Sequence, residues 1–308
     1  MKTVNFINRR LFIAVVSVGL VLFSCATQLV AAEVSPLRIL LTNDDGYDTP
    51  GIKAVRAALI RAGHDVTLVA PLKNQSSSGA RVTTRGTLDY KEQSPGVWSV
   101  DGSPADSVLV GLLHIMGDES PDLVVSGANF GQNPGYAINS GTVGAATVAM
   151  YAGFPAIAVS VGVDLSEASA KPYAFPSTLK AFAGAAELSV SLIGDLQKTH
   201  DDNGDLLPGH TILNVNYPAL DPEKIKGVRV VPAARTSGVR FDYEDTPEAG
   251  QLKIKISAID PDKAGNFDAD WQMFARGFVT ISVLDGDWDA GQSLRDGIST
   301  RLSTVGQH

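Results

Sequence analysis

A short apolar run that ends in a turn with two adjacent acidic residues restricts the fold of this chain more than any other feature. Residues 39–42 read Ile-Leu-Leu-Thr, which is short enough for one buried strand. Residues 43–46 read Asn-Asp-Asp-Gly, and all of these residue types favour turns. A helical pattern begins at Ile52. Asp44 and Asp45 are therefore expected at the carboxyl end of a first strand, the edge at which open α/β sheets bind ligands.

Strand and helix patterns alternate over the first two thirds of the chain and predict an α/β fold. The expected core is a Rossmann-like, doubly wound and mostly parallel sheet. An antiparallel excursion is expected at 82–90 and 97–100. The other predicted strands are 39–42, 65–70, 122–126, 154–160 and 212–216, and the predicted helices are 52–62, 104–116, 143–152 and 173–196.

The pattern changes after residue 227. Period-two runs at 253–256 and 278–283 predict β-hairpins, and a short helix is expected at 289–302. No linker separates this part from the core. The predicted organisation is a single domain of 33–308, with the core at about 37–220 and a β-rich arm with a C-terminal helix at about 221–305.

The first 32 residues have the pattern of a secretory signal peptide. Residues 8–10 read Asn-Arg-Arg and form a basic region, 11–23 are apolar and uncharged, and 30–32 offer small residues for cleavage. Export, most simply to the periplasm, is therefore expected. Residues 22–25 also resemble a lipoprotein box, so a lipid anchor at Cys25 is an alternative, and an uncleaved anchor is another.

Charge and cysteine content exclude several classes of protein. The formal net charge of −8 argues against a protein that binds nucleic-acid polymers through a basic surface. Cys25 is the only cysteine, so a chain cleaved after Ala32 has no disulfide and no thiol nucleophile. Membrane contact is expected only through the signal peptide or a lipid anchor. Phosphate-binding GxxxxGK[ST] and nucleophilic GxSxG motifs are absent from the sequence.

Three polar loops follow three predicted strands of the same sheet. They span 43–46, 74–79 and 127–135, and the last is expected to be too rich in glycine for any regular element. In a parallel sheet all three gather at one edge. Their carboxylate, hydroxyl and amide oxygens, including those of Asn129 and Asn133, suit a hard cation such as Mg²⁺, Mn²⁺ or Ca²⁺ better than zinc. A cation with incomplete coordination then attracts a phosphate dianion.

Ser140, Gly141 and Thr142 precede or open a predicted helix of small residues. Free backbone N–H groups and the helix dipole at such a position favour an anion, and the two hydroxyls add donors. Taken alone, the same three residues are also an ordinary helix cap.

Four segments resemble the SurE (survival protein E) nucleotidase family. They are ILLTNDDGYDTPGI at 39–52, VAPLKNQS at 69–76, VVSGANFGQNPG at 124–135 and NSGTVGAA at 139–146. Further matches are DGSPADSV at 101–108, LNVNYP at 213–218 and GFVTISVL at 277–284, with Asp270 upstream. The resemblance covers nearly the whole chain after the signal peptide.

The resemblance implies one divalent metal ion per subunit, Mg²⁺ or Mn²⁺ with Ca²⁺ as a further candidate. Its ligands would be Asp44, Asp45, Ser76 and Asn129. The family fold is a Rossmann-like core with a C-terminal hairpin extension that mediates dimerisation, so a homodimer or homotetramer is expected. The implied activity is hydrolysis of phosphomonoesters, mainly 5′- and 3′-nucleoside monophosphates.

The chain departs from the family pattern in two places. Its serine loop reads NQSSSG at 74–79 and is longer than the common form. Ser76 and Ser78 are therefore rival metal ligands, and the distance from Asn74 favours Ser76. The family is usually cytoplasmic, whereas this sequence predicts export, which favours a scavenging role.

The resulting hypothesis is a metal-dependent phosphomonoesterase. Asp44 and Asp45 are the candidate catalytic residues, either through activation of water or, alternatively, as a covalent nucleophile. A small phosphomonoester is the expected partner. The alternatives are a broad-specificity periplasmic acid phosphatase or exopolyphosphatase, and a protein that binds phosphate or nucleotides without turnover. The candidate phosphate-binding residues are Asn133, Ser140, Gly141 and Thr142.

Overall fold

The structure, a computed structural model, describes residues 35–135, 137–199, 204–235, 239–260, 268–287 and 291–302. These residues belong to one compact unit, Val34–His308. The predicted signal peptide and Cys25 lie outside the described residues.

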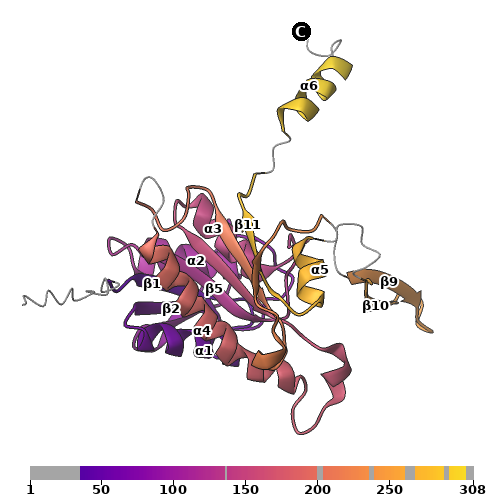
Figure 1. Ribbon diagram of the computed structural model, residues 1–308, viewed down its shortest axis with the longest axis horizontal. Coiled ribbons are helices and arrows are strands. Elements are labelled where there is room, and N and C mark those ends of the chain that lie inside the picture. Colours follow the sequence, from indigo (N-terminus) through magenta and orange to yellow (C-terminus); the bar gives the residue numbers. More distant parts are fainter. Residues whose placement is uncertain are drawn as a thin grey trace, which may run out of the picture. The chain divides into compact units, whose positions relative to one another are not determined.

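Nine strands of the described residues form one mixed sheet, in the order β3-β4-β2-β1-β5-β6-β7-β11-β8 (Figure 1). The six central strands from β4 to β7 are parallel, whereas β3 and β11 are antiparallel to their inner neighbours. The strands are β1 (Arg38–Thr42), β2 (Asp65–Pro71), β3 (Tyr90–Ser94), β4 (Val97–Val100), β5 (Leu123–Phe130), β6 (Ala156–Val161), β7 (Ile212–Tyr217), β8 (Val228–Val230) and β11 (Val279–Leu284). This topology confirms the predicted doubly wound α/β core.

Helices cover both faces of the sheet. On one face α1 packs against α4, and on the other α2 packs against α3. The helices are α1 (Pro50–Arg61), α2 (Pro104–Val110) continued by the π-helix η1 (Gly111–Ile115), α3 (Gly141–Tyr151), α4 (Pro176–Lys198), α5 (Asp270–Ala275) and α6 (Gln292–Arg301), with short 3-10 turns η2 (Leu165–Ser169) and η3 (Pro222–Lys224). None of the helices in these described segments has both the length and the apolar character of a membrane span.

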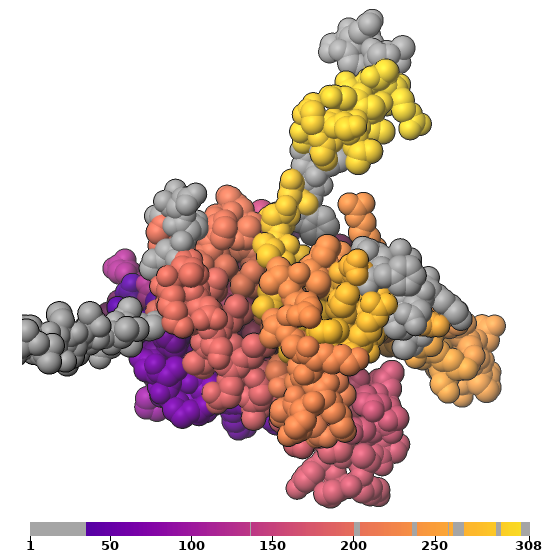
Figure 2. Space-filling view, viewed as in Figure 1, coloured from indigo at the N-terminus to yellow at the C-terminus, as the bar shows by residue number. Residues whose placement is uncertain are grey.

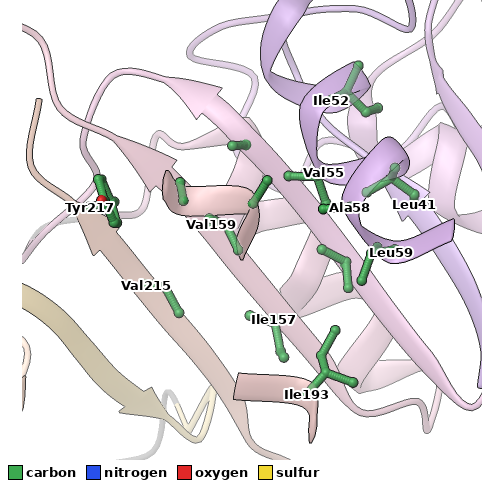
Figure 3. Close-up of a cluster of buried hydrophobic side chains, with 14 of the residues drawn as sticks. Leu41, Ile52, Val55, Ala58, Leu59, Ile157, Val159, Ile193, Val215 and Tyr217 are labelled. Atoms are coloured by element: carbon green, nitrogen blue, oxygen red, sulfur yellow. The ribbon is translucent and has the colours of Figure 1, made fainter. Parts of the chain in front are cut away.

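The central strands are apolar because both of their faces are buried. Side chains of α1, among them Ile52, Val55 and Leu59, point onto the sheet and meet Leu41 and Ile157 (Figure 3). The space-filling view shows α4 lying over this face of the core (Figure 2). Burying each of these aliphatic side chains contributes roughly 1.5–3 kcal/mol, so this layer fixes the strand ends that carry the polar loops.

Two segments differ from the sequence prediction. Residues 127–130, expected to be irregular, continue β5, and the pairing register with β6 shifts between Ser126 and Asn129. Gly127 is needed for close packing here rather than for a turn, because a Cβ would lie 2.3 Å from the Val159 carbonyl oxygen.

The second difference concerns the C-terminal part. β11 does not form a local hairpin but pairs with β7 and β8, so the main sheet extends past residue 220, where the arm was expected to begin. A period-two pattern indicates a half-buried strand but does not identify the strand with which it pairs. The predicted hairpin at 253–256 is present as β9 (Val239–Asp245) and β10 (Leu252–Ala258), a separate antiparallel pair.

The start of α2 is fixed by a capping box. Ser103 Oγ accepts from the N–H of Asp106, while Asp106 Oδ2 accepts from the N–H of Ser103 at 2.9 Å. Asp106 also accepts from the N–H and hydroxyl of Thr83 at 2.7 and 2.9 Å. Burial alone would raise the pKa of Asp106, but these hydrogen bonds outweigh it and lower the pKa from its ordinary value.

We expect Asp106→Ala to lower the free energy of unfolding at pH 7 by about 2–4 kcal/mol, because it leaves several donors unpaired. A depressed folded-state pKa contributes stability above the ordinary value of 3.8, and this stability is lost as the pH falls through the folded-state pKa. The difference from wild type should therefore shrink in acid. Urea denaturation at several pH values measures it, with the exposed Asp118→Ala as control. Equal stabilities of the two variants at pH 7 would contradict this prediction.

Candidate active site

The carboxyl ends of three parallel strands bring the predicted polar loops together. β1 lies between β2 and β5 in parallel register, so residues 43–46, 72–79 and 131–135 leave the same edge of the sheet. A cavity of about 430 Å³ opens there. Its polar lining includes Asp44, Ser76, Ser77, Asn129, Gln132, Asn133, Asn139 and Ser140.

The loop after β1 is closed by the side chain of Asn43, which is fully buried. Its Nδ2 donates to the Gly46 carbonyl at 3.0 Å, and its Oδ1 accepts from the Gly46 N–H at 3.1 Å. Gly46 has a φ of +117°, a conformation that strongly favours glycine. This tight turn fixes the positions at which the side chains of Asp44 and Asp45 project from the backbone.

Asp44 is almost fully buried, with 3% of its surface exposed. Thr142 Oγ1 donates to Asp44 Oδ1 at 2.6 Å, and Gln75 N–H donates to the Asp44 carbonyl at 2.7 Å. Burial raises the pKa of Asp44, and the Thr142 hydrogen bond partly offsets this shift. Asp44 therefore links the first loop to both the serine loop and the start of α3.

Asp45 is held by the third loop. Its Oδ2 accepts from the Phe130 N–H at 2.8 Å, and Asn74 Nδ2 lies 3.4 Å from its Oδ1. Burial, and next the charge of Asp44, raise the pKa of Asp45 to about 6. Neither carboxylate forms an ion pair with a lysine or arginine among the described residues. The two negative charges thus lie close together without a protein cation to balance them.

The serine loop presents two hydroxyls in different settings. Ser76 is exposed and lines both the main cavity and a neighbouring one of about 300 Å³ that Asp45 also lines. Ser78 Oγ is buried without a hydrogen-bond partner, and a Cβ built on Gly141 would lie 2.8 Å from it. Both serines remain candidate ligands on this geometry.

Asn129 and Asn133 have different surroundings. Asn129 is 7% exposed, and its Nδ2 donates to the Gly131 carbonyl at 2.6 Å, which leaves its Oδ1 as the end available to a ligand. Asn133 lines the same cavity, but its Nδ2 donates to Ser160 Oγ at 2.9 Å.

The start of α3 joins this group. Ser140 Oγ accepts from the Val143 N–H at 3.1 Å and caps the helix. Gly141 lies against Asp44, since a Cβ there would be 2.7 Å from Asp44 Cβ. The Thr142 hydroxyl, which sequence reasoning had assigned to the phosphate, donates to Asp44. The structure thus brings all eight candidate residues to one edge of the sheet.

The donor set is one that a hard cation would fit. The described residues contain no group of three or more His, Cys, Asp and Glu placed to hold a metal ion. This edge of the sheet instead offers two carboxylates whose charges no protein cation balances, together with neutral hydroxyl and amide oxygens. Such a set suits Mg²⁺ or Mn²⁺, which prefer oxygen ligands and retain some bound water.

Three further side chains contact the loop at 131–135 without lining the cavity, and they were not predicted as part of the site. They are Asn214, Asn216 and Asp270. A signal for the first two was present in the sequence, because asparagines at alternate positions of an otherwise apolar strand need a buried partner.

Comparison with known proteins identifies the family of the chain. The family model of survival protein SurE matches residues 39–239. A 5′-nucleotidase SurE from Pseudoalteromonas atlantica is 32% identical over 261 residues, covering 84% of this chain and 97% of the relative. Another from Nitratidesulfovibrio vulgaris is 34% identical over 274 residues, covering 87% and 99%.

A solved structure extends the comparison to the fold. The crystal structure of the SurE protein from Aquifex aeolicus has a TM-score of 0.71 with this chain at 30% sequence identity. The match covers 86% of this chain and 99% of the other. Sequence and structure agree over most of the chain, and on these grounds it belongs to the survival protein SurE family.

Proposed function

We propose that this chain is a metal-dependent nucleotidase, a phosphomonoesterase that releases phosphate from nucleoside monophosphates. The observation that carries the proposal is the meeting of Asp44 with the serine loop, Asn129 and the start of α3 around one cavity, while Asp45 lines the adjoining cavity that Ser76 shares. The SurE relatives, which are named 5′-nucleotidases, support the substrate class.

Asp44, Asp45, Asn129 and Ser76, with Ser78 as the alternative hydroxyl, would hold one divalent ion. When bound, this ion would polarise the phosphoryl group and lower the pKa of a water molecule. Thr142 keeps Asp44 oriented through its hydroxyl, and the Phe130 N–H does the same for Asp45.

The remaining residues act on the phosphate and on the proton. Gly141 and Thr142 place backbone N–H groups at the start of α3, Ser140 adds its hydroxyl, and Asn133 lines the same cavity. A water oxygen forms the new bond to phosphorus as the ester P–O bond breaks. One Asp carboxylate accepts the proton of that water and returns it to the leaving nucleoside oxygen, which departs as the alcohol. Direct attack by Asp44 or Asp45 to form an aspartyl phosphate is the alternative, and trapping of a labelled phospho-enzyme would identify it.

Phosphate release separates the candidate functions. With Mg²⁺ or Mn²⁺ we expect release from 5′-AMP or 3′-AMP, loss in EDTA and recovery when metal is restored. Full activity in EDTA would refute the proposed dependence on a metal ion. Equal rates with p-nitrophenyl phosphate or a short polyphosphate would favour a broad-specificity phosphatase, and AMP binding in calorimetry without turnover would favour a binding protein.

Export and assembly are part of the same proposal. The signal-peptide pattern supports a periplasmic enzyme, with a lipid anchor as the alternative, and recovery of the protein in the cytosol would argue against both. Apolar side chains exposed on β9, β10, α6 and the residue after α6 support a homodimer or homotetramer, and light scattering that gives a monomer mass would contradict it. These side chains are Phe241, Tyr243, Leu252, Ile254, Ile256, Leu294, Ile298 and Leu302.

A further inference from the structure

The loop at 131–135 is held by side chains that lie behind it. Asn216 Oδ1 accepts from the Asn133 N–H at 2.7 Å, and Asn214 Nδ2 donates to the Asn133 carbonyl at 2.8 Å. Asp270 Oδ2 accepts from the Gly135 N–H at 2.8 Å. Three side chains from β7 and α5 thus fix the backbone of a loop that lines the cavity.

The two asparagines make only part of their possible hydrogen bonds. Their orientation follows from Asn133, because its N–H needs an acceptor and its carbonyl needs a donor. The opposite ends, Asn214 Oδ1 and Asn216 Nδ2, are buried and have no partner. Buried polar atoms without partners destabilise a fold, so stability alone does not account for two asparagines in the apolar strand β7.

Asp270 connects the loop to more distant parts of the chain. It is fully buried, and it accepts from Ala234 N–H at 2.8 Å, from Trp271 N–H at 2.7 Å and from Ser282 Oγ at 3.1 Å. One carboxylate therefore joins the loop to the segment before β9, to α5 and to β11.

We infer that Asn214, Asn216 and Asp270 are positioning residues of the reaction, which hold the loop at 131–135 so that Asn133 faces the phosphate. The inference rests on the proposed function. None of the three lines the cavity, so they act through the loop and not on the substrate. A shift of about 1 Å in a loop of this kind lowers turnover by up to roughly 100-fold.

Two identical substitutions on the same strand face test the inference. Asn216→Asp keeps an oxygen acceptor for the Asn133 N–H, whereas Asn214→Asp sets a carboxylate oxygen against the Asn133 carbonyl. Each substitution introduces one buried carboxylate, and the two positions are two residues apart on the strand. We expect kcat/KM for AMP to fall by less than about 3-fold in the first variant and by about 30-fold or more in the second.

Asp270→Asn with Ser282→Ala as its control gives a second comparison. The asparagine loses one acceptor oxygen, so we expect faster amide exchange in peptides that cover 131–135 and a higher KM for AMP. Ser282 contacts Asp270 but not the loop, so its alanine variant should leave both unchanged. If Asn214→Asp does not fold, Asn214→Ala removes the same donor without adding a charge.

The results have clear readings. Equal losses in the two aspartate variants, or losses that follow the unfolding midpoint while exchange in the loop stays at the wild-type rate, would overturn the inference. If the wild-type protein releases no phosphate from AMP, the proposed function fails, and the exchange measurements still decide whether these residues hold the loop.

Discussion

Asp45→Asn is expected to lower kcat/KM for AMP by about 10³-fold or more, because it removes half of the charge offered to the cation and one of the two candidate proton acceptors. The asparagine has nearly the same shape, and its Oδ1 can still accept from the Phe130 N–H. Steady-state phosphate release at saturating metal measures the loss. Turnover within about tenfold of wild type would remove Asp45 from the mechanism.

The same variant is expected to be more stable than wild type when metal is absent. A folded-state pKa of about 6 means that the folded protein binds this proton more tightly than the unfolded chain does. Stability is then lost as the pH rises from the ordinary value of 3.8 through 6, by up to about 3 kcal/mol. Urea denaturation of the metal-free proteins at pH 8 should show this gain, and at pH 3 it should vanish.

Asp48→Asn is the matched control, because the substitution is the same and lies in the same segment. The Asp48 side chain is 68% exposed and forms a surface ion pair with Lys53. Pairs of this kind contribute about 0–1 kcal/mol, so activity and stability should stay close to wild type. A large loss of activity in this control would indicate a general disturbance of the loop.

The placement of the site was predictable from the sequence, because it depends on strand direction. Apolar runs that end in polar turns identify β1, β2 and β5, and a parallel sheet places their carboxyl ends at one edge. The three loops and the start of α3 follow from this rule alone. The alternation of strand and helix patterns likewise predicted the two helical layers.

The hydrogen bonds within the site could not be read from local patterns. The Thr142 hydroxyl has the same N-terminal helix position whether it binds an anion or Asp44, and only the packing of α3 against the first loop decides between them. Gly127 belongs to a glycine-rich run that resembles a loop, yet it lies in β5. Glycine is required there because Val159 approaches too closely to leave room for a side chain. Contacts between residues distant in sequence decided both cases.

Gly141→Ala is expected to lower kcat/KM for AMP by about 100-fold or more, although alanine is favoured over glycine in helices by about 1 kcal/mol. The added Cβ would lie 2.7 Å from Asp44 Cβ and 2.8 Å from Ser78 Oγ, closer than side-chain atoms pack. Either the first loop or the serine loop must shift, and both carry candidate ligands. Phosphate release and the gain in thermal stability on adding Mn²⁺ should therefore fall together.

Gly194→Ala in α4 separates this effect from helix propensity. Apart from its chain neighbours and the backbone of its own helix, no atom of the described residues lies within 4 Å of a Cβ at Gly194. The substitution should therefore raise the free energy of unfolding by about 0.5–1 kcal/mol and leave turnover unchanged. If Gly141→Ala instead behaved like this control, the loops would tolerate displacement of Asp44, and a site that depends on close contact between the first loop and α3 would be wrong. A loss confined to Gly141→Ala would show that the missing side chain is what allows the carboxylate to lie against the helix.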